Sequence, residues 1–226
     1  MEIGIIGSGN IGSILAGYLT ALGHQVFIAN SRGPESLGEV GRKTGATAVT
    51  TAQAAGAKDL VIIAIPNKAA VNLPIDILSV SEAIIVDAGN YYPSRDGQIA
   101  AIEAGLTDSE WVANVIGHSV IKAFNNIVAP SLATKAVSVG SPNRIALSVA
   151  GDDKPQKWAV MKLIDEIGFD AIDGGLLSES WRQQPGEPAY CQDLDKGTLT
   201  SALQQADIRK RADNLATADD MARPYL

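Results

Sequence analysis

The chain has 226 residues, of which 46% are hydrophobic, 19% are charged and 5% are aromatic. This apolar fraction is ample for a buried core and argues against a disordered chain. Eighteen basic residues against 25 acidic residues give a formal net charge of −7. A surface with this charge repels a polyanion, so nucleic acid is not expected as a partner.

Cysteine and histidine are scarce. The single cysteine, Cys191, excludes an intramolecular disulfide, and His24 and His118 are too few for a Cys/His zinc site, so we expect no metal. The longest apolar run, residues 60–66, is much shorter than the roughly 20 residues of a membrane-spanning helix. No basic segment precedes the N-terminal apolar stretch, which argues against a secretory signal. We therefore expect a cytoplasmic protein without a membrane partner.

Short aliphatic runs alternate with amphipathic segments over the first two thirds of the chain, a pattern typical of βαβ units on a parallel sheet. We predict strands at about residues 2–6, 25–29, 46–50, 60–65, 84–88, 119–124 and 145–150. Helices are predicted at residues 11–22, 34–45, 154–167 and 198–214 from apolar spacing and from proline, capping residues and glycine at their ends. The fold class is therefore α/β.

Residues Gly7-Ser8-Gly9-Asn10-Ile11-Gly12 match the pattern G-x-G-x-x-G between the first strand and the first helix. In this context the pattern predicts a dinucleotide site. Gly7 is expected to permit the tight turn, Gly9 to let the backbone approach a pyrophosphate, and Gly12 to let the helix pack on the strand. The helix N-terminus then offers free N–H groups to the phosphates. A glycine turn without a ligand is the alternative interpretation.

Residues Asn30-Ser31-Arg32 follow the second strand, where NAD sites usually carry an acidic residue that binds the ribose hydroxyls. No carboxylate is present here to repel a 2′-phosphate. Ser31 can donate one hydrogen bond, and Arg32 can donate charge-assisted ones. The sequence thus favours NADP(H) over NAD(H), with an ordinary solvent-exposed loop arginine as the alternative for Arg32.

Further cofactor contacts are expected where the fourth and fifth strands end, because ligands of open parallel sheets bind outside the carboxyl ends of the strands. The candidates are Ala64, Ile65 and Pro66 on the adenosine side and Asn90 near the second ribose and nicotinamide. We predict a Rossmann-type doubly wound parallel sheet with a small C-terminal α/β and helical extension. Residues 1–151 would form the NADP-binding domain, and residues 152–226 a small substrate and dimerisation region.

With these motifs in place, the sequence resembles the F420-dependent NADP oxidoreductase family, small enzymes that exchange hydride between NADP(H) and the deazaflavin F420. The resemblance extends from Ile3 to about Ser180. It rests on the glycine motif and on residues 30–32, 87–90, 120–127, 150–153 and 173–178.

This resemblance implies a homodimer and an electron acceptor stacked against the nicotinamide in the cleft between the Rossmann domain and the C-terminal portion. It also implies that Ser8, Asn10 and Ile11 line the cofactor together with residues 31–32. Ala123 would lie beside the nicotinamide carboxamide. Residues 124–127 and 181–191 depart from the family pattern where the second substrate should bind, so either F420 or a flavin is expected there.

Candidates for a proton donor are few. They are Lys122, which could instead be a solvated strand-end lysine; His118, which could be a structural histidine; and Tyr190, which follows a proline-rich loop. Trp181 and Arg182 could stack on an anionic acceptor or serve packing and surface charge. Hydride transfer to a ring depends mainly on proximity and orientation, so this scarcity favours a ring acceptor over a small carbonyl.

We therefore expect an NADP(H)-dependent oxidoreductase that transfers hydride between nicotinamide and a deazaflavin or flavin-like ring. One alternative is an NADPH-dependent reductase of a small imine or carbonyl, similar to pyrroline-5-carboxylate reductase. A second is a non-catalytic NADPH-binding regulator, since the fold alone does not imply chemistry.

Overall fold

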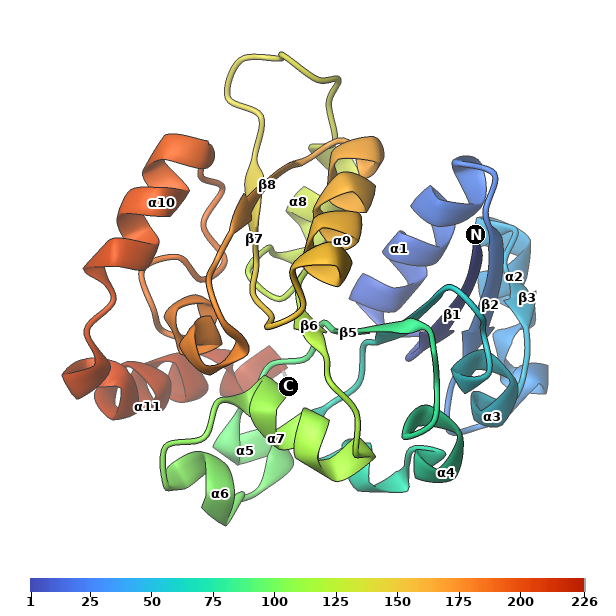
Figure 1. Ribbon diagram of the computed structural model, residues 1–226, viewed down its shortest axis with the longest axis horizontal. Coiled ribbons are helices and arrows are strands. Elements are labelled where there is room, and N and C mark those ends of the chain that lie inside the picture. The colour runs from blue at the N-terminus through green and yellow to red at the C-terminus, as the bar shows by residue number, and fades with distance from the viewer. Residues whose placement is uncertain (226) are drawn as a thin grey trace.

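A six-stranded parallel sheet forms the centre of the protein in the computed structural model, which describes residues 1–225 (Figure 1). Its order is β3-β2-β1-β4-β5-β6. The strands are β1 (Glu2–Ile6), β2 (Gln25–Ala29), β3 (Thr47–Ala48), β4 (Leu60–Ile63), β5 (Ile84–Asp87) and β6 (Ile121–Lys122). The order reverses between β1 and β4, which opens a crevice at their carboxyl ends. The predicted Rossmann-type fold is confirmed.

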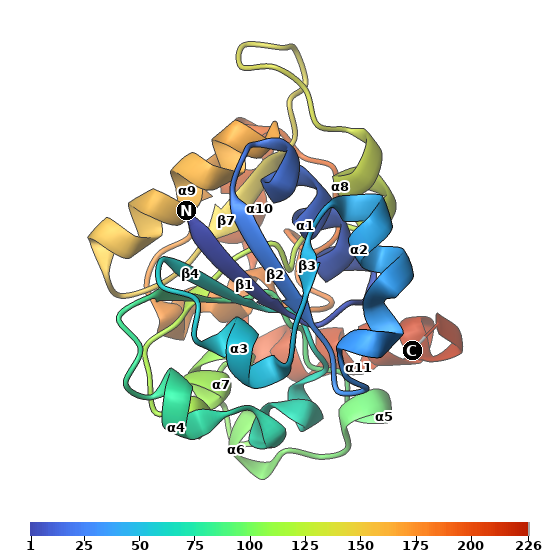
Figure 2. The same ribbon diagram turned by 90° about the vertical axis from the view of Figure 1, so that its right-hand side faces the viewer.

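Helices cover both faces of this sheet, which is why its central strands are apolar on both sides. Along each strand, successive side chains enter opposite cores: Ile5 belongs to one core and Ile6 to the other. Figure 2 shows α8 and α9 on the upper side and α3, α4 and α7 on the lower side. The first core is closed by α1 (Asn10–Ala21), α2 (Gly38–Thr44), α8 (Ala129–Thr134) and α9 (Lys154–Ile167); the second is closed by α3 (Thr51–Ala55), α4 (Ile75–Leu78) and α7 (Asp108–Ile116).

Local signals explain the ends of these helices. The carboxylate of Asp153 accepts a hydrogen bond from the backbone of Gln156 and begins α9, and Gly168 ends it with a φ of 119°. The segment predicted as one helix over residues 34–45 is a 3₁₀ turn, η1 (Pro34–Leu37), that continues into α2.

A second, two-stranded sheet follows the six-stranded one. It pairs β7 (Ala146–Val149) in parallel with β8 (Asp170–Asp173), and an antiparallel bridge between Lys122 and Ala150 joins β7 to β6. The strand β8 was not among the predicted elements. One apolar core extends from β1 to α9, and the predicted domain boundary at residue 151 falls inside the unit β7–α9–β8; that boundary stays a prediction.

The C-terminal part is mostly helical. The elements after β8 are η3 (Leu177–Gln183), α10 (Lys196–Gln205), η4 (Ile208–Lys210), α11 (Arg211–Ala222) and η5 (Arg223–Tyr225). The prediction of a single helix over residues 198–214 is wrong. The Asp207 carboxylate accepts a hydrogen bond from the backbone of Arg209 and caps a new turn there.

The remaining short elements lie between β4 and α7. They are η2 (Asn67–Asn72), α5 (Pro93–Asp96) and α6 (Ala100–Glu103). Helix α11 packs near α5, and the Asp219 carboxylate accepts hydrogen bonds from the backbone N–H and the hydroxyl of Ser94 (Figure 1). None of the helices formed by residues 1–225 has the length and apolar character of a membrane-spanning helix.

Candidate active site

The loop between β1 and α1 shows a different environment at each of its three motif glycines. Gly7 has a φ of 120°, and a Cβ there would lie 2.2 Å from the carbonyl oxygen of Ala64. A Cβ on Gly12 would lie 1.9 Å from the carbonyl oxygen of Gly7. A Cβ on Gly9 would meet no atom within 4 Å. The fold itself therefore requires Gly7 and Gly12, whereas the space at Gly9 is open.

The open space at Gly9 lies at the start of α1. This helix begins at Asn10 without a side-chain cap, so its first backbone N–H groups have no side-chain partner. Both Asn10 and Ile11 line a cavity, as Gly9 does. A helix N-terminus of this kind can bind a phosphate through its N–H groups and the positive end of the helix dipole.

A cavity of about 640 Å³ lies at the carboxyl ends of β1, β2 and β4, and we call it the β2-side cavity. Among its lining residues are Gly7, Ser8, Gly9, Asn30, Ser31, Arg32, Ala64, Ile65 and Pro66, all of them predicted cofactor residues. Arg32 is exposed, and its guanidinium forms no ion pair or hydrogen bond within residues 1–225. A free cation thus stands at the end of β2, where a 2′-phosphate was expected.

The turn that carries Arg32 is held by Asn30. The Asn30 side-chain amide donates hydrogen bonds to the hydroxyls of Ser8 (3.2 Å) and Ser36 (2.9 Å). Its oxygen accepts a hydrogen bond from the backbone N–H of Arg32 at 2.9 Å. Asn30 therefore connects the glycine loop to the turn after β2.

A second cavity of about 480 Å³ adjoins the first, with Gly9 and residues 64–66 in both walls. We call it the tyrosine cavity, since Tyr92 and Tyr190 line it. Its other lining residues include Asn10, Ile11, Ala88, Gly89, Asn90, Arg95, Phe124, Asn125 and Cys191. Among the described residues of this wall, Arg95 carries the only charged side chain.

The backbone is strained in the wall of the tyrosine cavity. Three non-glycine residues within residues 1–225 have a positive φ, and two of them, Phe124 (64°) and Cys191 (53°), line this cavity. Left-handed backbone at a bulky residue is unfavourable and persists where the surroundings enforce it, often at functional sites.

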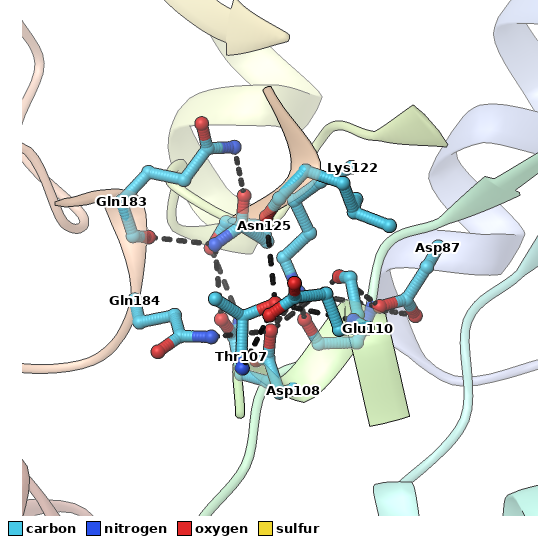
Figure 3. A network of polar contacts seen from close by, with 12 residues as sticks. Asp87, Thr107, Asp108, Glu110, Lys122, Asn125, Gln183 and Gln184 are labelled. Atoms are coloured by element: carbon cyan, nitrogen blue, oxygen red, sulfur yellow. Dashed lines mark hydrogen bonds and ion pairs between the residues drawn. The ribbon is translucent and has the colours of Figure 1, made fainter. Parts of the chain in front are cut away.

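Lys122 lies beneath this cavity rather than in it. Its side chain is 0% exposed, and Nζ lies 3.0 Å from Asp108 Oδ1, 3.3 Å from Asp87 Oδ2 and 2.6 Å from the carbonyl oxygen of Gly89 (Figure 3). Burial alone lowers the pKa of Lys122, but the carboxylates of Asp108 and Asp87 outweigh it and hold that pKa above its ordinary value. The ammonium therefore stays charged, and it holds the loop that carries Gly89.

Side-chain amides extend this network to the segment η3. The Asn125 side chain donates to the carbonyl oxygen of Gln183 and accepts from the Gln183 amide, both at 2.7 Å (Figure 3). The same Asn125 amide donates to Asn90 at 3.1 Å. The Gln184 amide donates to Asp108 Oδ1 at 2.6 Å. The C-terminal part is thereby fastened to the wall of the tyrosine cavity.

Three other predicted site residues, Gly12, His118 and Ala123, line neither of the two cavities. Ala123 and Gly12 are buried and line neither cavity, so the expected place of Ala123 beside the nicotinamide stays a prediction. The two ring nitrogens of His118 lie 2.7 Å from the carbonyl oxygen of Ser119 and 3.0 Å from that of Ser81, before β6 begins and outside both cavities.

Of the predicted residues in the segment 181–191, some line a cavity and others do not. The guanidinium of Arg182 stacks over the ring of Trp181 at 4.8 Å, and neither residue lines the two cavities. Tyr190, in contrast, lines the tyrosine cavity, and its hydroxyl lies 2.7 Å from that of Tyr92. Burial raises the pKa of Cys191 to about 11, so its thiol is uncharged at neutral pH.

The sequence interpretation did not include Tyr92, Arg95, Asp108, Gln183 or Gln184 among the functional residues. The signal that could have found Tyr92 and Arg95 was their position a few residues past β5, at and within the short helix α5 that follows the carboxyl edge of the sheet. The other three meet the site only through contacts that are distant in sequence.

Comparison with known proteins supports the relation to nicotinamide-dependent enzymes. A family model described as NADP oxidoreductase, coenzyme F420-dependent, matches residues 2–91. The crystal structure of the hypothetical protein SMa0349 from Sinorhizobium meliloti is 34% identical with a TM-score of 0.72, covering 87% of this chain and 96% of that one.

Two further relatives are more limited. A protein of Arthrobacter sp. FB24 named for F420-dependent NADP reduction is 23% identical with a TM-score of 0.67, covering 80% of this chain and 87% of that one, which shows the common fold. Protein YjhV of Escherichia coli (strain K12) is 42% identical over 67 residues, which are 30% of this chain and 49% of YjhV. The chain thus spans about half the length of that curated relative.

Proposed function

We propose, on the premise that this chain belongs to the F420-dependent NADP oxidoreductase family through residues 2–91, that it transfers hydride between NADP(H) and a deazaflavin or flavin-like ring. The observation that carries this proposal is the pair of adjoining cavities along the carboxyl edge of the sheet. One ends at the free cation of Arg32, and the other ends at two tyrosines. This is the arrangement that a dinucleotide and a second, ring-shaped substrate need.

The residues of the β2-side cavity fit the adenosine and phosphate part of NADP(H), and Asn90, expected near the nicotinamide, lines the tyrosine cavity. The space at Gly9 and the N–H groups of α1 suit the pyrophosphate, while Ser31 and Arg32 suit the 2′-phosphate. Residues 64–66 would flank the adenosine. When bound, NADP(H) supplies the hydride, and the protein supplies binding and orientation.

The remaining task of the protein is to hold the acceptor ring in position and to exclude water. Lys122 and Asn125 fix the loop that carries Gly89 and Asn90, so this part of the wall of the tyrosine cavity is held in place. A fixed wall favours transfer because rate depends on holding the reacting atoms in near-attack geometry. The expected homodimer and cytoplasmic location remain predictions.

Replacing Gly9 by alanine should weaken NADPH binding about tenfold or more and leave thermal stability unchanged. The φ of −72° at Gly9 suits alanine, and the new Cβ would meet no protein atom within 4 Å, so its only effect is to fill the space where the pyrophosphate would lie. Fluorescence titration with NADPH and a thermal melt measure the two effects. Gly38→Ala is the matched control, since its Cβ also meets no atom and Gly38 lines neither cavity. Equal NADPH affinity in Gly9→Ala and Gly38→Ala would refute this use of Gly9.

The experiment that tests the proposed function follows NADPH oxidation by the wild-type protein against F420, FMN, FAD and pyrroline-5-carboxylate. We expect turnover with at least one of the ring acceptors and none with the imine. Turnover with the imine alone would favour the second candidate function, an NADPH-dependent reductase of a small imine or carbonyl. The hydroxyls of Tyr92 and Tyr190 in the cavity favour that candidate, because such a reductase needs a hydrogen-bond donor at the atom that gains charge.

A further inference from the structure

The tyrosine cavity contains a pair of hydroxyl groups whose hydrogen-bonding capacity is not used up. Tyr92 and Tyr190 approach each other with 2.7 Å between their oxygens, and neither hydroxyl forms another hydrogen bond to N or O within residues 1–225. Each hydroxyl carries one hydrogen. One hydrogen serves the bond between the two tyrosines, and the other has no strong acceptor.

This spare hydrogen is available to a molecule that enters the cavity. Tyr92 is 8% exposed and Tyr190 is half-buried, so only water in the cavity can pair with this hydrogen, and a ligand that displaces the water must supply an acceptor in its place. The thiol of Cys191 adjoins the Tyr190 hydroxyl, but sulfur is a weak acceptor. A third group with an oxygen or nitrogen acceptor would satisfy the pair.

The wall around the pair offers other donors of the same kind. The guanidinium of Arg95 lies over the Tyr92 ring at 5.4 Å and uses Nε and Nη2 on Asp96 and on the carbonyl oxygen of Asn90, while Nη1 has no partner within residues 1–225. No carboxylate side chain is among the described residues that line the cavity. The cavity therefore presents N–H and O–H groups to a ligand that accepts hydrogen bonds.

We propose that the hydroxyl pair of Tyr92 and Tyr190 binds a carbonyl oxygen of the electron acceptor, so that the acceptor is a compound with a carbonyl group at the atom that is reduced or conjugated to that atom. This inference rests on the proposed function of the same site and narrows its substrate class. Pyrimidinedione rings such as those of flavins and deazaflavins belong to this class, and tricyclic rings without a carbonyl do not.

The pair acts as a hydrogen-bond donor rather than as an acid. Burial raises the pKa of Tyr190 far above its ordinary value, and burial also raises that of Tyr92, so both hydroxyls stay protonated at neutral pH. In the reaction the acceptor gains a hydride with its two electrons from NADPH, and a proton from water completes the reduction. Part of the negative charge that develops meanwhile lies on the carbonyl oxygen, where a fixed donor stabilises it.

The test compares two tricyclic probes that differ in their carbonyl groups. Lumiflavin carries two ring carbonyls, and N-methylphenazinium carries none. Binding of each is measured by fluorescence or absorbance titration of the protein saturated with NADP⁺, in the wild type and in the double variant Tyr92→Phe/Tyr190→Phe. We expect the double variant to bind lumiflavin about 2- to 10-fold more weakly, the range for a hydrogen bond between uncharged groups, and phenazinium equally well.

The double variant removes both hydroxyls together, which leaves no polar group unpaired and preserves the fold better than a single truncation. Tyr91→Phe is the control, because the Tyr91 hydroxyl is bonded to Gly97 and Glu103 and does not line the cavity. Its lumiflavin affinity should equal that of the wild type.

Failure of the wild type to bind lumiflavin, or equal lumiflavin affinity in the wild type and the double variant, would overturn the inference. NADPH oxidation is followed separately with both probes and with F420. If lumiflavin binding depends on the tyrosines but no acceptor oxidises NADPH, the donor pair stands and the proposed oxidoreductase function fails. If NADPH is oxidised and the double variant matches the wild type with lumiflavin, the function stands and the donor pair fails.

Discussion

Replacing Lys122 by methionine should lower the free energy of unfolding by about 3–5 kcal/mol. The ammonium of Lys122 lies within 3.3 Å of carboxylate oxygens of both Asp87 and Asp108, and all three side chains are buried. Methionine has a similar volume but no charge, so two buried carboxylates would lose their shared counter-ion. Equilibrium unfolding in urea with two spectroscopic probes measures the change and checks that unfolding remains two-state.

The pH dependence of this loss follows from the pKa of Lys122, which is raised in the folded protein. A group with a raised pKa contributes stability that is fully present below its unfolded pKa and disappears as pH rises through its folded pKa. At neutral pH the contribution of Lys122 is therefore complete. The control is Lys43→Met, which removes an exposed pair with Glu39 and should leave stability unchanged. An equally stable Lys122→Met protein would mean that this buried cluster does not support the fold.

Replacing Arg32 by alanine should reduce the preference for NADPH over NADH by about 10- to 100-fold, the range expected for loss of charge-assisted hydrogen bonds to a phosphate. The effect should appear in the dissociation constant of NADPH, whereas that of NADH changes little, because only NADPH carries the 2′-phosphate. Binding titrations with both nucleotides give the ratio directly.

The matched control for Arg32→Ala is Arg42→Ala, which removes an exposed arginine of α2 that does not line the β2-side cavity. This change alters net charge equally but leaves the ratio of the two dissociation constants as it is in the wild type. A ratio that falls equally in both variants would point to a general electrostatic effect and not to a contact with the phosphate.

Most of the sheet could be predicted because its strands are marked locally. The run Leu60–Ile63 is apolar without interruption, as a strand covered on both faces should be, and glycines end several of the helices. Strand β8 carries no such mark. Its two apolar residues stand between Asp170 and Asp173, a pattern that loops share, and only pairing with β7 makes it a strand. Apolar spacing likewise continued past Asp207, where the structure begins a new turn.

The two cavities of the candidate site also differ in how far the sequence could predict them. The β2-side cavity is formed by short loops that directly follow strands, so a motif of six residues and the strand ends were enough to name its wall. The tyrosine cavity depends on Tyr92 and Tyr190, which lie 98 residues apart. Lys122 was expected at a strand end, in solvent or facing the cleft, but it is paired with the carboxylate of Asp108 on α7. No pattern in the residues around Lys122 predicts this ion pair. Contacts of this range arise from the packing of the chain, and local patterns do not encode them.

The role of Asn30 limits how the nucleotide preference of this scaffold can be redesigned. An Asn30→Asp change would install the acidic residue typical of NAD sites, and it would keep an oxygen for the backbone N–H of Arg32. It would also remove the side-chain N–H groups of Asn30, which now donate hydrogen bonds to the hydroxyls of Ser8 and Ser36. A negatively charged carboxylate would then lie beside these two hydroxyls. A change of coenzyme preference at this position therefore also alters the turn, since the residue that stands where NAD sites carry their acidic group is also the one that joins the glycine loop to the end of β2.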